Sequence, residues 1–311
     1  MPSAVSGGAR IRTNTPAENA YNALQASSNN IALRQLRLST GKRINSAADD
    51  VSGYITSRAL GARNGALRSA LMAVGDASNV ANIAQDGYDN INNLLTSIKD
   101  AAATASSGAL GTDEKIALSK AAYRLAQQIQ TVVDSTVFGG RQLIAGGFSG
   151  DFVIGYDAAN SLLTLAVDLT TSASQANFNV DGVFNVNVTS NTNFAGVTGL
   201  NLNSLDSVTP ANLQLFSNST ISLTLTSLSM ALNNVNKVAS YLGGMVNRLS
   251  SQEEALKSQI TNYRAAISRL EDADVALEQL ELVKAQFLQQ TSVTSLAQAN
   301  QSPQIFLQLM R

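Results

Sequence analysis

The side chains that most often carry out enzymatic chemistry are scarce in this sequence of 311 residues. It has no Cys and no His, which excludes thiolate and imidazole nucleophiles, imidazole bases and metal sites built from those ligands. The acids in the middle of the chain are far apart in sequence and lie among turn-forming residues, where Asp usually shapes a turn. These acids are Asp151, Asp157, Asp168, Asp181 and Asp206. We expect no enzymatic activity, no cofactor and no bound metal.

Two glycine pairs, Gly139-Gly140 and Gly146-Gly147, could suggest a phosphate-binding loop. A P-loop needs a Lys followed by Ser or Thr directly after its glycines, and neither pair is followed in this way. We interpret both pairs as turns that lead into a β-rich region.

Charge and hydropathy also exclude several classes of partner. The formal net charge is -1, which gives no general attraction to nucleic acid or to an anionic membrane. No stretch approaches the roughly 20 continuous apolar residues of a membrane helix. With 44% hydrophobic residues, the chain can build a core, so we expect protein partners or self-association, without nucleic acid binding or membrane insertion.

The apolar residues form two seams with a seven-residue period. Such a period marks long helices that must bury a stripe against other helices. The C-terminal seam comprises Leu228, Val235, Leu242, Leu249, Leu256, Tyr263, Leu270 and Leu277. The N-terminal seam comprises Leu60, Leu67, Val74, Ala81, Tyr88, Leu95 and Ala102. We expect the two seams to cover each other.

These seams place the predicted helices. We expect helices over about residues 17–40, 51–106, 112–135 and 222–270, followed by a terminal helix that includes Leu277. Asp49 and Asp50 are candidate caps for the second helix, and Thr112 or Asp113 is the expected N-cap of the third.

The middle of the chain has a different character. From residue 142 to residue 236 there is no Lys or Arg, and Asn, Ser, Thr, Gly and Val dominate. Alternating segments at 149–155, 178–180 and 183–188 predict short strands. The predicted fold is therefore mainly α with a β-rich insert: a long antiparallel helical bundle or coiled coil with both termini at one end and a small β tip.

Several motifs near the two ends occur together. The N-terminal motif is STGKRINSAADDVSG at 39–53. The C-terminal motifs are RLEDAD at 269–274, KAQFLQQ at 284–290, LAQANQ at 296–301, Pro303-Gln304 and the closing Leu309-Met310-Arg311. In type and order they resemble the N- and C-terminal signatures of bacterial flagellin.

The resemblance implies a layered architecture. Flagellins pair their terminal helices into an inner tube, surround it with a helical-bundle shell and expose a variable middle region. It implies five parts along the chain: an N-terminal inner-tube helix (1–47), the N-terminal part of the bundle (48–145), a surface-exposed β-rich variable region (146–221), the C-terminal bundle helix (222–270) and a C-terminal inner-tube helix (271–311).

The resemblance also implies a function and partners. The chain would be a structural subunit that polymerises with many copies of itself into the extracellular flagellar filament for swimming. It would leave the cell unfolded through the flagellar export apparatus, served by a flagellin chaperone, and would meet the filament cap and hook-associated proteins. Residues 1–10 lack the apolar core of a cleavable signal, which fits such a route.

Two other functions are weighed against this one. The hook–filament junction protein shares the N-terminal signature, but the run 298–301 and the Leu-Met-Arg ending are flagellin-like. Some flagellins carry a protease in the middle region, but its zinc motif requires His, which this chain lacks.

The terminal seams are expected to serve assembly. We expect the seam from Leu228 to Leu270 to close a core within one subunit. The terminal seams find no element of the single chain long enough to cover them, so we expect neighbouring subunits to do so. The acidic run 271–274 is either a solvated cap at a helix joint or a subunit contact. The predicted assembly residues are Leu24, Ile31, Leu38, Arg43, Ile44, Asn45, Asp49, Asp50, Leu277, Leu280, Phe287, Leu296, Ile305, Phe306 and Leu309.

Overall fold

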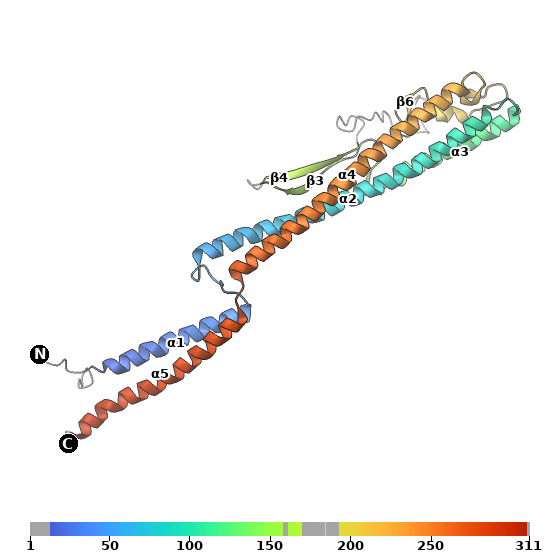
Figure 1. Cartoon of the computed structure of the whole chain (residues 1–311). Helices are drawn as coiled ribbons and strands as arrows, with labels where there is room; N and C mark the ends of the chain where they lie inside the picture. The colour runs from blue at the N-terminus through green and yellow to red at the C-terminus, as the bar shows by residue number, and fades with distance from the viewer. Residues whose placement is uncertain (1–12, 158–160, 170–183, 185–192, 310–311) are drawn as a thin grey trace. The chain divides into compact units, whose positions relative to one another are not determined.

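The computed structural model describes residues 13–157, 161–169, 184 and 193–309, and for 302–309 it describes the backbone alone. Most of this part is helical, as predicted. The helices are α1 (Thr15–Thr40), α2 (Val51–Ala105), α3 (Thr112–Ser135), α4 (Ile221–Glu271) and α5 (Val275–Leu309) (Figure 1). The predicted helix boundaries agree with these to within about two residues.

The chain divides into two compact units, which we describe separately. The terminal unit comprises Met1–Asn64 and Thr261–Arg311, and the central unit comprises Gly65–Ile260. The long helices α2 and α4 each contribute to both units. The five-part division proposed from the sequence remains a prediction.

The core of the central unit follows the predicted seams. In α2, Leu67, Val74 and Leu95 are buried, and a second line of mostly small residues beside them is fully buried as well. The facing residues of α4 are buried from Leu228 to Leu256. The residues of the second line are Ala70, Ala77, Ala84, Ile91 and Ile98. The prediction of an intrachain core is therefore confirmed for this part of both seams.

The starts of two helices test the predicted caps. Asp50 caps α2, because its Oδ1 accepts a hydrogen bond from the Gly53 amide at 2.9 Å. The cap predicted for α3 is wrong: Gly111 occupies the N-cap position and no side chain caps the helix there. Thr112 is already helical, and Asp113 lies in the first turn, where the positive end of the helix dipole stabilises its negative charge.

The β-rich region consists of three short antiparallel hairpins in the described residues. They pair β1 (Val137–Phe138) with β2 (Arg141–Gln142), β3 (Ser149–Tyr156) with β4 (Leu162–Asp168), and β5 (Asn193–Phe194) with β6 (Val197–Thr198). Two 3-10 turns follow, η2 (Leu202–Leu205) and η3 (Gln214–Phe216). The strand predicted at 149–155 is confirmed, whereas those at 178–180 and 183–188 lie outside the described residues apart from Phe184.

The turn between β1 and β2 explains the first glycine pair. Gly139 and Gly140 have φ of 57° and 79°, the positive values that a tight two-residue hairpin turn requires at both central positions. Their interpretation as a turn is therefore confirmed.

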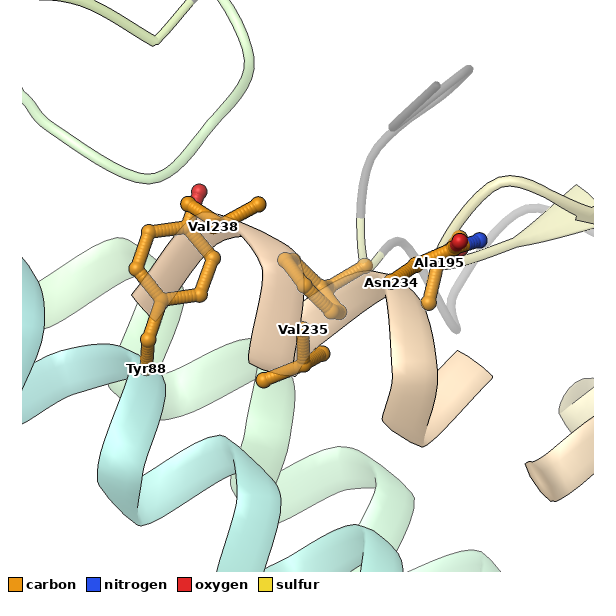
Figure 2. A pocket seen from close by; sticks show the side chains of 6 residues that line it. Tyr88, Ala195, Asn234, Val235 and Val238 are labelled. Carbon is orange, nitrogen blue, oxygen red and sulfur yellow. The ribbon is translucent and has the colours of Figure 1, made fainter. Parts of the chain in front are cut away.

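The β-rich region contributes to the helical core instead of standing apart from it. The ring of Phe184 makes edge contacts with Tyr88 of α2 and Phe194 of β5, at centroid distances of 6.2 and 5.6 Å. Asn234 of α4 donates a hydrogen bond to the Ala195 carbonyl at 2.9 Å. Figure 2 shows this site, whose lining leaves no room for a water molecule. Aromatic packing thus anchors the insert to α2, and a hydrogen bond anchors it to α4.

Helices α1 and α5 pack side by side and antiparallel in the terminal unit (Figure 1). Asn14 beside the start of α1 donates to the Ala299 carbonyl at 2.9 Å, while Arg34 near the end of α1 meets Glu278 in the first turn of α5. The beginning of α1 therefore lies beside the C-terminal part of α5, as the fold prediction requires.

Candidate assembly surface

Helix α5 is apolar on two opposite faces. Its inner face packs on α1 and buries Ala285. The other face exposes Leu277, Leu280 and Phe287, whose spacings of three and seven residues place them on one side of the helix. Phe287 is 68% exposed and Leu280 62%. We call this exposed side, with the neighbouring Val283, the outer face of α5.

Helix α1 directs its seam toward α5. Leu24, Ile31 and Leu38 are half-buried and share a face with Ala20 and Ser27, which are buried. The expectation that no element of the chain could cover the terminal seams is therefore wrong for α1, because α5 covers part of it. The role of these residues in assembly remains a prediction.

The remaining predicted residues of the C-terminal end fall into two groups. Leu296 is half-buried and lines an open groove of about 570 Å³ between α5 and the start of α1. Ile305, Phe306 and Leu309 belong to the last turns of α5, and their side chains lie outside the described residues.

A short two-stranded contact joins the chain after α1 to the chain before α5. The Ala273 amide donates to the Gly41 carbonyl at 2.9 Å, and the Arg43 amide donates to the Glu271 carbonyl. The Lys42 ammonium lies 2.8 Å from the Glu271 carboxylate. We call residues 41–43 with 271–273 the clasp. It ties the two terminal helices together at one end.

The acidic run 271–274 is used within the chain. Glu271 is buried in the clasp, and the hydrogen bond from Lys42, assisted by one from Ser57, lowers its pKa below the ordinary value. Asp274 caps α5 by accepting hydrogen bonds from the amides of Ala276 and Leu277 at 2.9 and 3.2 Å. The capping interpretation is therefore correct for Asp274, while Glu271 is paired and buried and not merely solvated.

The residues of the N-terminal motif are likewise engaged inside the subunit. Arg43 donates to the Leu270 carbonyl at 2.8 Å. Asp49 accepts hydrogen bonds from the backbone amides of Ser46 and Asn45 at 2.8 and 3.0 Å, and these bonds lower the pKa of its carboxyl group. These hydrogen bonds of the motif therefore stabilise the turn between α1 and α2.

Gly53 of the same motif lies in a closely packed position. A Cβ atom at this position would lie 2.6 Å from the Ile44 side chain and 2.5 Å from the Asp50 carboxylate. Ile44 itself is buried. Its side chain is therefore part of the intrachain core in this structure.

A second charged group lies between α1 and α5. The Glu278 carboxylate is 2.8 Å from Arg34 and 3.3 Å from Arg37. Burial would raise the pKa of Glu278, but hydrogen bonds and charge from the two arginines outweigh it and lower the pKa. We call these three residues the Arg–Glu clamp. The clamp was not predicted from the sequence, although Arg34 and Arg37 are the only basic residues of α1.

The described residues contain no group of acids arranged to hold a metal ion. Among the helices described, none is both long and apolar enough to cross a bilayer. What the terminal unit offers is a helix pair, fixed at one end by charges, with an apolar outer face. This arrangement is suited to contact with other helices and defines a self-associating structural protein.

Comparison with known proteins agrees with this class. Two family models match the chain: the bacterial flagellin N-terminal helical region over residues 11–149, and the bacterial flagellin C-terminal helical region over residues 225–310. The flagellin of Halalkalibacterium halodurans is 27% identical over 301 residues, which cover 97% of this chain and 99% of that protein. Flagellin FlaB1 of Treponema pallidum is 27% identical and covers 88% of this chain and 90% of that protein.

The two family models together span more than half of the chain, so the chain belongs to the bacterial flagellin family. It is a structural subunit of the flagellar filament. A solved putative flagellar hook-associated protein from Vibrio parahaemolyticus shares the fold, with a TM-score of 0.55 at 14% identity over 72% of this chain and all of that one. This likeness concerns the fold alone, so the hook-associated alternative is not better supported than flagellin.

Proposed function

We propose that the outer face of α5 is the surface through which neighbouring subunits contact one another in the filament. The observation that supports this is the exposure of Leu277, Leu280 and Phe287 on a helix whose opposite face already packs on α1. Removing one such side chain from water contributes about 1.5–3 kcal/mol. A row of them is therefore enough to favour burial between subunits.

Assembly and the final ordering of the terminal unit form one coupled step in this proposal. Among the described residues, α1 packs mainly on α5, and α5 leaves its outer face in water. Helices gain most of their stability from tertiary packing. Contact with neighbouring subunits therefore stabilises the same helices that make the contact.

The proposed role extends to the route and the partners of the subunit. The chain acts through assembly and not through catalysis, outside the cell, in the filament that drives swimming. It passes through the flagellar export apparatus, and a flagellin chaperone keeps it from associating beforehand. At the filament ends it meets the cap and hook-associated proteins. An exposed apolar helix face explains why such a subunit needs a chaperone before assembly.

Seeded polymerisation tests the contact surface. We expect Phe287→Ser to reduce filament elongation on seeds at least about tenfold, since one lost apolar contact per interface corresponds to one or more factors of ten. Leu162→Ser in β4 is the matched control, because Leu162 is also well exposed, at 57%, but lies in the β-rich region. Elongation is followed by light scattering and electron microscopy.

The control separates the surface from general solubility. Equal elongation of Phe287→Ser and the unmodified chain would show that the outer face of α5 is not the contact surface. An equal loss in Leu162→Ser would show that the effect is not specific to α5.

A further inference from the structure

The Arg–Glu clamp places three charged side chains inside a helix contact that otherwise needs none. The Glu278 side chain is only 6% exposed, and those of Arg34 and Arg37 are 23% and 16% exposed. Elsewhere along the same contact, Ala20, Ser27 and Ala285 are buried and Leu24, Ile31 and Leu38 are half-buried. Small apolar and hydroxyl groups could bury this contact without any charge, so the clamp must contribute something other than burial.

Burying a carboxylate is costly unless it is paired and hydrogen-bonded. Glu278 meets this condition because both arginines of α1 reach it, one at each carboxylate oxygen. A helix without cations at this position would leave Glu278 buried and unpaired. The clamp therefore penalises any other helix that packs on the inner face of α5.

A second copy of α5 is the competitor that the sequence makes most relevant. Helix α5 is apolar on both faces, and its single basic residue is Lys284. That residue is exposed and forms an ion pair with Glu281 at 3.5 Å. An α5–α5 contact through the inner face would bury two Glu278 carboxylates without their arginines.

Direction and register follow from where the charges lie. Arg37 is in the last turn of α1 and Glu278 is in the first turn of α5, so only antiparallel helices bring them together. Each charge also lies at the helix end where the dipole favours it. The half-buried Leu24, Ile31 and Leu38 and the clasp also favour this register, and the clamp adds a charge pairing that sliding by one turn would break.

We propose that the Arg–Glu clamp is a specificity determinant that selects the antiparallel, in-register pairing of α1 with α5 over the pairing of α5 with a second α5. Buried polar groups fix register and partner choice in this way in helix pairs. The proposal concerns the inner face of α5 and holds whether or not the outer face is the filament contact.

Cross-linking in the cysteine-free chain measures this pairing directly. Gln289 of α5 donates a hydrogen bond to Ser28 of α1 at 3.1 Å, so the full chain carrying Ser28→Cys and Gln289→Cys reports the observed register through a short thiol cross-linker. In this background we expect Glu278→Arg to lower the intrachain cross-link yield at least about tenfold, because the clamp becomes three buried like charges. Yields are measured for the free chain and for the chain after seeding.

A charge swap separates pairing from a general loss of folding. We expect Glu278→Arg combined with Arg34→Glu and Arg37→Glu to restore the cross-link yield to within about threefold of the yield without these charge changes, since the opposite charges meet again. Glu281→Arg is the control on the same helix and should leave the yield unchanged, because Glu281 pairs only with exposed Lys284 and exposed pairs contribute little.

A chain with Gln289→Cys alone reports the competing α5–α5 contact as an interchain cross-linked dimer. We expect Glu278→Leu to raise this dimer at least about tenfold at equal concentration, because the penalty on the inner face is removed. The proposal is overturned if dimer formation does not rise, if the charge swap does not restore the 28–289 cross-link, or if that cross-link is absent both before and after seeding. None of these results depends on whether Phe287→Ser still elongates filaments.

Discussion

The central and terminal units share the same heptad pattern but bury its apolar residues to different extents. In the central unit, Leu228 to Leu256 and the facing residues of α2 are buried within one chain. In the terminal unit, the seam of α1 is half-buried and α5 exposes its outer face. The difference shows that a heptad seam does not by itself determine how completely a single chain buries it.

The means of stabilisation also differ between the two units. The central unit relies on close packing of Ala, Leu and aromatic side chains, such as Tyr88 against Phe184. The terminal unit relies on the clasp and the Arg–Glu clamp, which are charged. The central unit should therefore respond to changes in packing and the terminal unit to changes in charge.

Removal of one tyrosine from each unit should give the largest contrast. We expect Tyr88→Ala to lower the free energy of unfolding by about 3–5 kcal/mol, as for other large aromatic residues removed from a core. Tyr21→Ala on α1 should change it by less than about 0.5 kcal/mol, because Tyr21 is 57% exposed. Urea unfolding followed by circular dichroism measures both. Similar losses in the two variants would contradict a central unit that is packed within one chain and a terminal unit that leaves large side chains in water.

Acid should affect the terminal unit before the central unit. The pKa values of Glu271 and Glu278 are lowered in the folded chain relative to 4.5, so the unfolded chain takes up protons first as the pH falls. Their contribution to stability is therefore complete above about pH 4.5 and is lost as the pH falls through the lowered folded values. The hydrogen-exchange protection factors of the α1 amides should fall in this window, while those of the buried α2 amides stay high.

A chain in which both carboxylates are made neutral is the control for this pH effect. Glu271→Gln with Glu278→Gln should remove most of the change in α1 exchange below pH 4.5. If α1 still loses protection over the same window, groups other than these two carboxylates control the acid response of the terminal unit.

Most of the fold could be predicted from the sequence because helix formation leaves a periodic pattern. The break after Thr40, the cap at Asp50 and the long seams all follow from local residue types. The anchoring of the β-rich insert could not be predicted, because the contact of Phe184 with Tyr88 joins residues with no shared local pattern.

The candidate site was predicted less completely, and for a physical reason. Exposure of Leu277, Leu280 and Phe287 agrees with a helix that is apolar on two faces. The Arg–Glu clamp was missed because Arg34 and Glu278 are 244 residues apart, and no spacing rule connects them. Arg43 and Asp49, which were predicted to serve assembly, make hydrogen bonds within the chain, and their role in assembly remains a prediction.

The smallest contrast concerns the first turn of α2 in the terminal unit. Asp50→Ala removes the hydrogen bond to the Gly53 amide and should cost about 1 kcal/mol, the usual value for loss of an N-cap. Asp113→Ala at α3 is the matched control, since no side chain caps that helix, and it should cost less than about 0.5 kcal/mol. Hydrogen exchange should show faster exchange of the Gly53 amide in Asp50→Ala alone. This cap lies beside the clasp. If faster exchange also spread into α1, the terminal unit would open as a whole. If faster exchange were confined to the first turn of α2, the cap of α2 and the pair of α1 with α5 would be stabilised separately.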